Sequence, residues 1–122
     1  MIVMSILVVD DDPATRVTCE GALETEFDCY VAGSGEEALM VAEYEQPDLI
    51  LLDVQMPGMD GLGTLRKLKK NPLTAGIAVI LMSENVSTTE KTNQISNAIG
   101  IIEKPLDPST LSQQLRKIFE HL

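Results

Sequence analysis

The sequence has few of the residues that carry histidine or cysteine chemistry. It contains one histidine, His121, and two cysteines, Cys19 and Cys29. A hydrolytic triad needs a histidine beside a nucleophile. His121 lies at the end of the last predicted helix and is expected to be solvated, so it gives no support for such a triad. The cysteines show neither the C-x-x-C spacing of redox pairs nor the spacing of zinc ligands. We therefore expect two free, partly buried thiols in a reducing compartment.

Basic residues are also scarce. The chain has 9 Lys and Arg against 19 Asp and Glu, which gives a formal net charge of −10. Binding to nucleic acid or to an anionic membrane surface requires many basic side chains, so neither partner is expected. An acidic protein instead attracts cations and basic partners.

Long apolar runs are missing as well. No stretch is long enough to span a bilayer, and the first residues have no basic flank before Asp10, so they do not resemble a signal peptide. A cytoplasmic protein is the expectation. With 122 residues, the chain is expected to form one domain over residues 1–122 with its own core.

Short apolar runs alternate with segments of helical periodicity. The five runs lie at residues 6–9, 29–32, 49–52, 77–82 and 99–102. Such alternation predicts βαβ units, and therefore an α/β fold with a doubly wound parallel sheet and helices on both faces. The strand order 2-1-3-4-5 of a flavodoxin-like (βα)5 fold is carried over from known folds of this class, and it makes the first and third strands neighbours.

Capping signals mark four helix starts. They are acid–proline pairs or Ser-x-x-Glu boxes, at Asp12-Pro13, Ser34–Glu37, Ser87–Glu90 and Asp107-Pro108. The third helical segment is predicted to end at Asn71-Pro72. The segment from Val86 to Ala98 has little apolar content and several poor helix formers, so it is predicted to be the most exposed and least stable helix.

The six methionines are interpreted as core and loop residues rather than a partner-binding groove.

Polar side chains follow four of the five apolar runs. Asp10 and Asp11 end the first run, Asp53 the third, Ser83 the fourth and Lys104 the fifth. With the first and third strands adjacent, the three carboxylates meet at the carboxyl ends of the strands. Carboxylates this close repel one another unless a cation neutralises them, and a hard divalent cation with oxygen ligands does so. A carboxylate nucleophile, a metal, a hydroxyl and a lysine are the groups that phosphoryl transfer to an aspartate uses.

Four stretches of the chain resemble the receiver domains of two-component response regulators, including the chemotaxis receivers. They read ILVVDDDP at 6–13, LLDVQMPGMDG at 51–61, LMS at 81–83 and EKP at 103–105. The stretches occur in the order and at the spacing of that family and extend over nearly the whole chain. The D-x-x-M-P-G-M-D-G block is the most specific of them.

The resemblance implies a phosphoacceptor and a metal site. Asp53 corresponds to the aspartate that takes a phosphoryl group from a histidine kinase or a phosphotransfer protein. Mg²⁺ would be bound directly by Asp11, Asp53 and the backbone carbonyl of Gln55. Asp10 would act mainly through a water molecule or a hydrogen bond. Asp12 precedes a proline and is interpreted as a helix cap alone.

The resemblance also implies a switch. Ser83 corresponds to the switch hydroxyl and Lys104 to the lysine that pairs with the phosphoryl group, with a cis bond expected between Lys104 and Pro105. Such a protein catalyses only its own phosphorylation and dephosphorylation. The change would be read on the face formed by the helix at 86–98, the strand at 99–102 and the last helix. A downstream effector, an output domain or a second copy in a homodimer would bind there.

Two positions depart from the family pattern. Ile101 stands where the family usually has a Tyr or Phe whose ring moves on activation, and isoleucine is shorter and stiff at χ1. The phosphorylation chemistry does not depend on that position, but the aromatic movement is not expected here. Glu84 follows the switch serine where the family often has a small residue, so it is expected to crowd or repel at the edge of the site.

Two other classes of function stay open on the sequence alone. A phosphatase that turns over external substrates through an aspartyl phosphate commonly has a second acid two residues after the nucleophile, whereas this chain has Gln55. A phosphorylation-silent docking or dimerisation module would use the same fold without the switch, and Ile101 is the feature that favours it.

Overall fold

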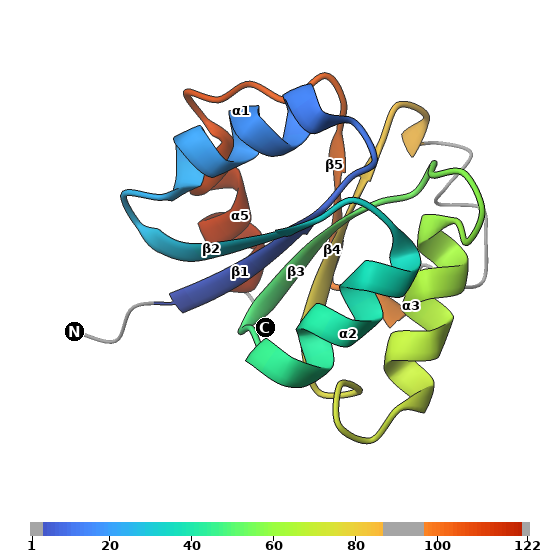
Figure 1. Cartoon of the computed structure of the whole chain (residues 1–122). Coiled ribbons are helices and arrows are strands. Elements are labelled where there is room, and N and C mark those ends of the chain that lie inside the picture. Colours follow the sequence, from blue (N-terminus) through green and yellow to red (C-terminus); the bar gives the residue numbers. More distant parts are fainter. Residues whose placement is uncertain (1–3, 87–96, 121–122) are drawn as a thin grey trace.

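The computed structural model describes residues 4–86 and 97–120, which form a central parallel sheet with helices on both faces (Figure 1). The strands are β1 (Met4–Val9), β2 (Phe27–Ala32), β3 (Leu49–Asp53), β4 (Ala78–Ser83) and β5 (Gly100–Glu103). The helices are α1 (Pro13–Leu23), α2 (Gly35–Glu45), α3 (Gly61–Lys70) and α5 (Leu111–Phe119). The helix expected at 86–98, with its Ser87–Glu90 cap, falls mainly on residues 87–96, which lie outside the described residues.

The strand order is β2-β1-β3-β4-β5 and every neighbouring pair is parallel, which confirms the predicted doubly wound, flavodoxin-like sheet. β1 lies between β2 and β3, and Val9 of β1 pairs with Leu52 of β3. Because Asp10 follows Val9 and Asp53 follows Leu52, the register brings these two aspartates together at the carboxyl edge of the sheet.

Side chains on β1 alternate between two apolar layers. Leu7 and Val9 belong to the layer that α2 and α3 cover, whereas Ile6 and Val8 belong to the layer that α1 and α5 cover. All four are completely buried. Burying an aliphatic side chain of this size contributes about 1.5–3 kcal/mol to folding. A strand buried on both faces has no polar alternation, which explains why the continuous apolar run predicted it correctly.

The predicted starts of α1 and α2 are confirmed. The Asp12 carboxylate accepts a hydrogen bond from the Ala14 N–H at 3.0 Å, directly before Pro13. The Ser34 hydroxyl accepts one from the Glu37 N–H at 3.1 Å. The Glu37 carboxylate returns a bond to the chain, but it accepts from the N–H of Gly33 rather than from that of Ser34.

The predicted start of the last helix is wrong by three residues. The α5 helix begins at Leu111, with Thr110 as its N-cap. The Asp107 carboxylate instead accepts hydrogen bonds from the N–H and the hydroxyl of Ser109, at 3.0 and 2.7 Å. An acid followed by proline starts a turn as readily as it starts a helix, and here a turn precedes the helix.

Within the described residues, no helix has the length and apolar character that crossing a bilayer requires.

The two cysteines are free, as predicted. Cys19 is buried in the layer beneath α1 and α5, and Cys29 is half-buried beside it. Burial raises the pKa of each thiol to about 11. Since the thiolate is the reactive form, thiols with this pKa are unreactive at neutral pH, and both side chains act as packing residues.

Candidate functional site

Three aspartates meet at the carboxyl edge of the sheet. One carboxylate oxygen from each of Asp10, Asp11 and Asp53 lies within 4.8 Å of the other two. Asp10 and Asp53 are buried, with exposed fractions of 0% and 3%, whereas Asp11 is exposed. The structure therefore brings together the carboxylates that the sequence placed at the ends of two separate strands.

Lys104 reaches this cluster from the loop after β5. Its Nζ lies 2.7 Å from Oδ2 of Asp10 and 3.3 Å from Oδ2 of Asp53. Burial by itself lowers the pKa of the ammonium, but the hydrogen bonds and negative charges of Asp10 and Asp53 outweigh it and raise that pKa above its usual value. The lysine therefore stays charged and neutralises part of the cluster.

Asp53 is hard to ionise in this setting. Burial raises its pKa from 3.8 to about 6, and the charge of Asp10 adds to that effect. The N–H of Gln55, which donates to Oδ1 at 3.1 Å, and the charge of Lys104 act in the opposite direction. A carboxylate with this pKa is still mainly ionised at neutral pH, but its charge is incompletely compensated.

The donor set fits a divalent cation. A cavity of about 170 Å³ is lined by Asp10, Asp11, Asp12, Asp53, Gln55, Glu84 and Lys104. Its walls thus hold five carboxylates and one ammonium, and carboxylate oxygens are hard ligands of the kind that Mg²⁺ prefers. The predicted ligands Asp11, Asp53 and Gln55 all line this cavity. Binding of Mg²⁺ through them stays a prediction, as does the use of the Gln55 carbonyl.

Ser83 lies at the same edge, at the end of β4. Its side chain is buried, and its Oγ accepts a hydrogen bond from the Asn85 N–H at 3.0 Å. The Lys104 N–H donates to the Ser83 carbonyl at 2.9 Å, which joins the ends of β4 and β5. Asp53 pairs in register with Met82, the residue before Ser83. The expected hydroxyl and lysine are therefore held next to the aspartates by the sheet itself.

The loop after Asp53 explains why its sequence is so specific. Gly58 has a φ of 75°, a conformation that favours glycine. A Cβ on Gly61 would collide with the backbone carbonyl oxygen of Asp53. The Asp60 carboxylate caps α3 by accepting from the Gly63 N–H at 2.7 Å. These residues fix the turn that places Asp53 and Gln55 beside each other.

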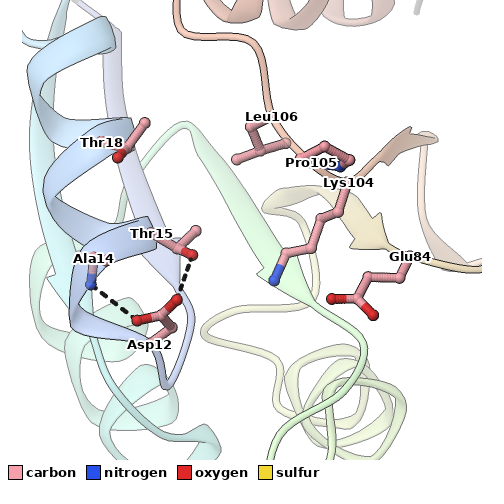
Figure 2. A pocket seen from close by; sticks show the side chains of 8 residues that line it. All are labelled: Asp12, Ala14, Thr15, Thr18, Glu84, Lys104, Pro105 and Leu106. Atoms are coloured by element: carbon pink, nitrogen blue, oxygen red, sulfur yellow. Dashed lines mark hydrogen bonds between the residues drawn. The ribbon is translucent and has the colours of Figure 1, made fainter.

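A second, larger cavity adjoins the acidic one (Figure 2). Its volume is about 540 Å³, and it is lined by Asp12, Ala14, Thr15, Thr18, Glu84, Lys104, Pro105 and Leu106. It shares Asp12, Glu84 and Lys104 with the acidic cavity. The Lys104–Pro105 bond in its wall is cis, as expected. This cavity could not be predicted from the sequence, because Thr15 and Thr18, two threonines on α1, form no recognisable motif.

Figure 2 shows that Asp12, which was interpreted from the sequence as a helix cap alone, also lines the cavity. Asp12 accepts hydrogen bonds from the Ala14 N–H and the Thr15 hydroxyl, at 3.0 and 3.1 Å, so it caps α1 as predicted while also lining both cavities. The side chains of Glu84 and Lys104 both reach this cavity, from the loops after β4 and β5. Glu84 is exposed and stands at the rim, as expected.

Ile101 lies on β5, away from these cavities. It pairs with Leu81 of β4 and is half-buried against the layer beneath α2 and α3. It also lines a groove on β5 and α5 together with Gln114, Lys117 and Ile118. Its position on that face agrees with the expectation, while its part in switching stays a prediction.

Comparisons with known proteins agree with this geometry. The profile of the response regulator receiver domain family matches residues 6–116. Response regulator PleD of Caulobacter vibrioides is 38% identical over 115 residues, which make up 93% of this chain and 25% of PleD. The nitrate/nitrite response regulator protein NarL of Escherichia coli is 37% identical over 119 residues, 93% of this chain and 53% of NarL. This chain thus spans a quarter to about half of these relatives.

Solved structures are similar over almost the full chain. Chemotaxis protein CheY4 of Vibrio cholerae superposes with a TM-score of 0.87 at 25% identity, covering 96% of this chain and 99% of that one. A response regulator from Desulfuromonas acetoxidans gives a TM-score of 0.82 at 32% identity and covers 98% of both chains.

Proposed function

We propose that this chain, which belongs to the response regulator receiver domain family, is a phosphorylation-dependent signalling switch with Asp53 as the phosphoacceptor. The observation that carries the proposal is the convergence of Asp10, Asp11 and Asp53 within 4.8 Å, with Lys104 in contact with two of them. We further propose that residues 1–122 form one receiver domain that works in the cytoplasm. Its phosphoryl donor is a histidine kinase or a phosphotransfer protein.

Asp11, Asp53 and the backbone carbonyl of Gln55 would hold Mg²⁺ directly, with Asp10 acting through water. Bound there, the ion supplies positive charge that neutralises the carboxylates and the developing charge of the phosphoryl group. The cavity that these residues line, with its excess of carboxylates over ammonium groups, supports this assignment.

The protein's own groups perform the transfer. An oxygen of the Asp53 carboxylate attacks the phosphorus of a phosphohistidine on the donor. The O–P bond of an acyl phosphate forms, the P–N bond breaks, and its electron pair returns to the histidine nitrogen. In the metal-free protein the pKa of about 6 leaves Asp53 mostly ionised at neutral pH, so its carboxylate is available as a nucleophile.

The switch consists of new bonds to the phosphoryl group. Lys104, which contacts Asp10 and Asp53 in the unphosphorylated protein, pairs with a phosphoryl oxygen, and the Ser83 hydroxyl donates to another. A hydrogen bond to a charged group contributes about 1.5–3 kcal/mol, which is enough to shift a two-state equilibrium by tenfold or more. The ends of β4 and β5 would transmit the change to the face that carries Ile101, for a downstream effector, an output domain or a second copy.

A phosphatase acting on external phosphoesters is less well supported. The residue two positions after Asp53 is Gln55, whose side-chain amide cannot serve as a general acid. We therefore propose that the protein catalyses only its own phosphorylation and dephosphorylation.

The test is the intact mass of the protein after incubation with acetyl phosphate and Mg²⁺. The wild type should gain one phosphoryl group, which EDTA prevents and which Asp53→Asn abolishes. Retention of the adduct in Asp53→Asn would place the phosphoacceptor elsewhere, and no adduct on the wild type would refute the proposal.

A further inference from the structure

An open apolar groove lies along the edge of the sheet opposite β5. Among the described strands, β2 pairs with β1 alone and is therefore an edge strand. The groove has a volume of about 340 Å³ and is lined by Tyr30, Val31, Met40, Val41, Tyr44 and Glu45. It shares no lining residue with the cavity that contains Asp53. We call it the β2–α2 groove.

Apolar exposure is concentrated at this groove. Within the described residues, five large apolar side chains are exposed, and three of them line it: Met40 at 68%, Tyr44 at 86% and Val31 at 37%. Met40 and Tyr44 are four residues apart on α2, so they are neighbours on its surface. Exposed apolar side chains gathered in this way mark an interaction site, and Tyr and Met are enriched in such sites. The other two, Val17 and Leu73, lie elsewhere.

The groove lies in an acidic part of the chain. No Lys or Arg occurs from Val17 to Leu65, while eleven acidic residues do. The acids on β2 and α2 are Asp28, Glu36, Glu37, Glu43 and Glu45. The first four are exposed, and the last is in the groove wall. The groove wall thus holds one acid, Glu45, and the other four acids lie on the two elements that form the groove, neither of which carries a Lys or Arg.

We propose that the β2–α2 groove is a docking surface for a basic amphipathic segment of another protein. Apolar side chains of that segment enter the groove, and its Lys and Arg side chains extend along their apolar stems to Glu45 and the other carboxylates of β2 and α2. Complementary charge selects the partner and speeds its association. A second copy of this chain is disfavoured, since each copy carries a net charge of −10 and would place acid against acid. The inference does not depend on the chemistry of Asp53.

The test uses a designed probe. A fluorescein-labelled peptide of about 18 residues, with Leu on one helical face and Lys on the other, is titrated with the protein and followed by anisotropy. A peptide of the same composition in scrambled order is the control for general attraction to an acidic protein. The amphipathic peptide should bind at least about tenfold more tightly than the scrambled one.

Charge-neutral variants locate the binding. The double variant Met40→Gln, Tyr44→Gln should weaken binding of the amphipathic peptide by about tenfold or more. Leu73→Gln, at an exposed apolar residue outside the groove, should leave it unchanged. All three side chains are exposed, so circular dichroism should report the same fold for each variant.

Three outcomes would overturn the proposal. Equal binding of the two peptides would mean that charge alone attracts them. Unchanged binding by the double variant would place the site elsewhere. A dimer seen by sedimentation of the wild type, and abolished by the double variant, would assign the groove to a second copy of the chain.

Discussion

At the scale of single residues, Asp53 carries a charge that the fold does not fully compensate. Its pKa is raised from 3.8 to about 6, so the folded protein holds a proton that the unfolded chain releases over that range. A group of this kind stabilises the fold below pH 4 and loses that contribution as the pH rises to about 6. At neutral pH the metal-free protein therefore bears the full cost of the buried charge.

Asp53→Asn should stabilise the metal-free protein at pH 7 by about 1–3 kcal/mol. Urea unfolding in EDTA should also show the gap between variant and wild type opening as the pH rises from about 4 to about 6, the range between the two pKa values. A gap independent of pH would mean that the charge of Asp53 is compensated in the fold.

Glu84 places a carboxylate at the rim of both cavities. A like charge about 4 Å away costs about 1 kcal/mol in water and more near a protein surface. Glu84→Gln should therefore raise the rate of phosphorylation by acetyl phosphate, an anionic donor, by about two- to tenfold. Glu120→Gln, an equal change of net charge just beyond the end of α5, is the control and should have no such effect. Equal rates in all three proteins would show that Glu84 does not restrict entry.

At the scale of elements, the β3–α3 loop depends on a close contact between two backbones. Gly61 sits against the Asp53 carbonyl, where a Cβ has no room. Gly61→Ala should destabilise the fold by about 1–3 kcal/mol and should slow phosphorylation, because the backbone of Asp53 at the end of β3, or the loop that follows it, must shift. Unfolding and phosphorylation rates measure the two effects.

Gly21 offers a control of opposite sign. It lies within α1, and a Cβ there meets no atom within 4 Å. Gly21→Ala should stabilise the protein by about 0.5–1 kcal/mol, since alanine is the better helix former. If both variants destabilise equally, the contact at Gly61 is not the reason for its glycine.

At the scale of the whole molecule, Mg²⁺ should stabilise the folded state because the unfolded chain has no such site. At a concentration 100 times the dissociation constant, the gain is about 2.7 kcal/mol. Asp11→Asn should reduce that gain. Asp12→Asn should keep it, because asparagine caps a helix as well as aspartate and Asp12 is not a proposed ligand. Thermal unfolding with and without Mg²⁺ measures both, and an equal loss in the two variants would mean that the ion is held by general acidity alone.

The sheet and the aspartate cluster were predictable from the sequence because buried parallel strands leave continuous apolar runs, and polar residues at their ends share one edge. The strand order was not readable from residues and came from the fold class. The start of α5 was wrong because Asp107-Pro108 favours a turn as well as a helix. The methionines were assigned to core and loops, but Met40 is exposed in the β2–α2 groove. Exposure of a single apolar residue depends on which neighbours cover it, and helical periodicity does not specify that.

Whether a phosphoryl group on Asp53 recruits Ser83 and Lys104 is best tested by amide hydrogen exchange with and without Mg²⁺ and beryllofluoride, which mimics a phosphorylated aspartate. With the mimic bound, exchange should slow at the ends of β4 and β5, around Ser83 and Lys104, in the wild type and not in Asp53→Asn. An exchange profile that is identical with and without the mimic in the wild type would contradict it.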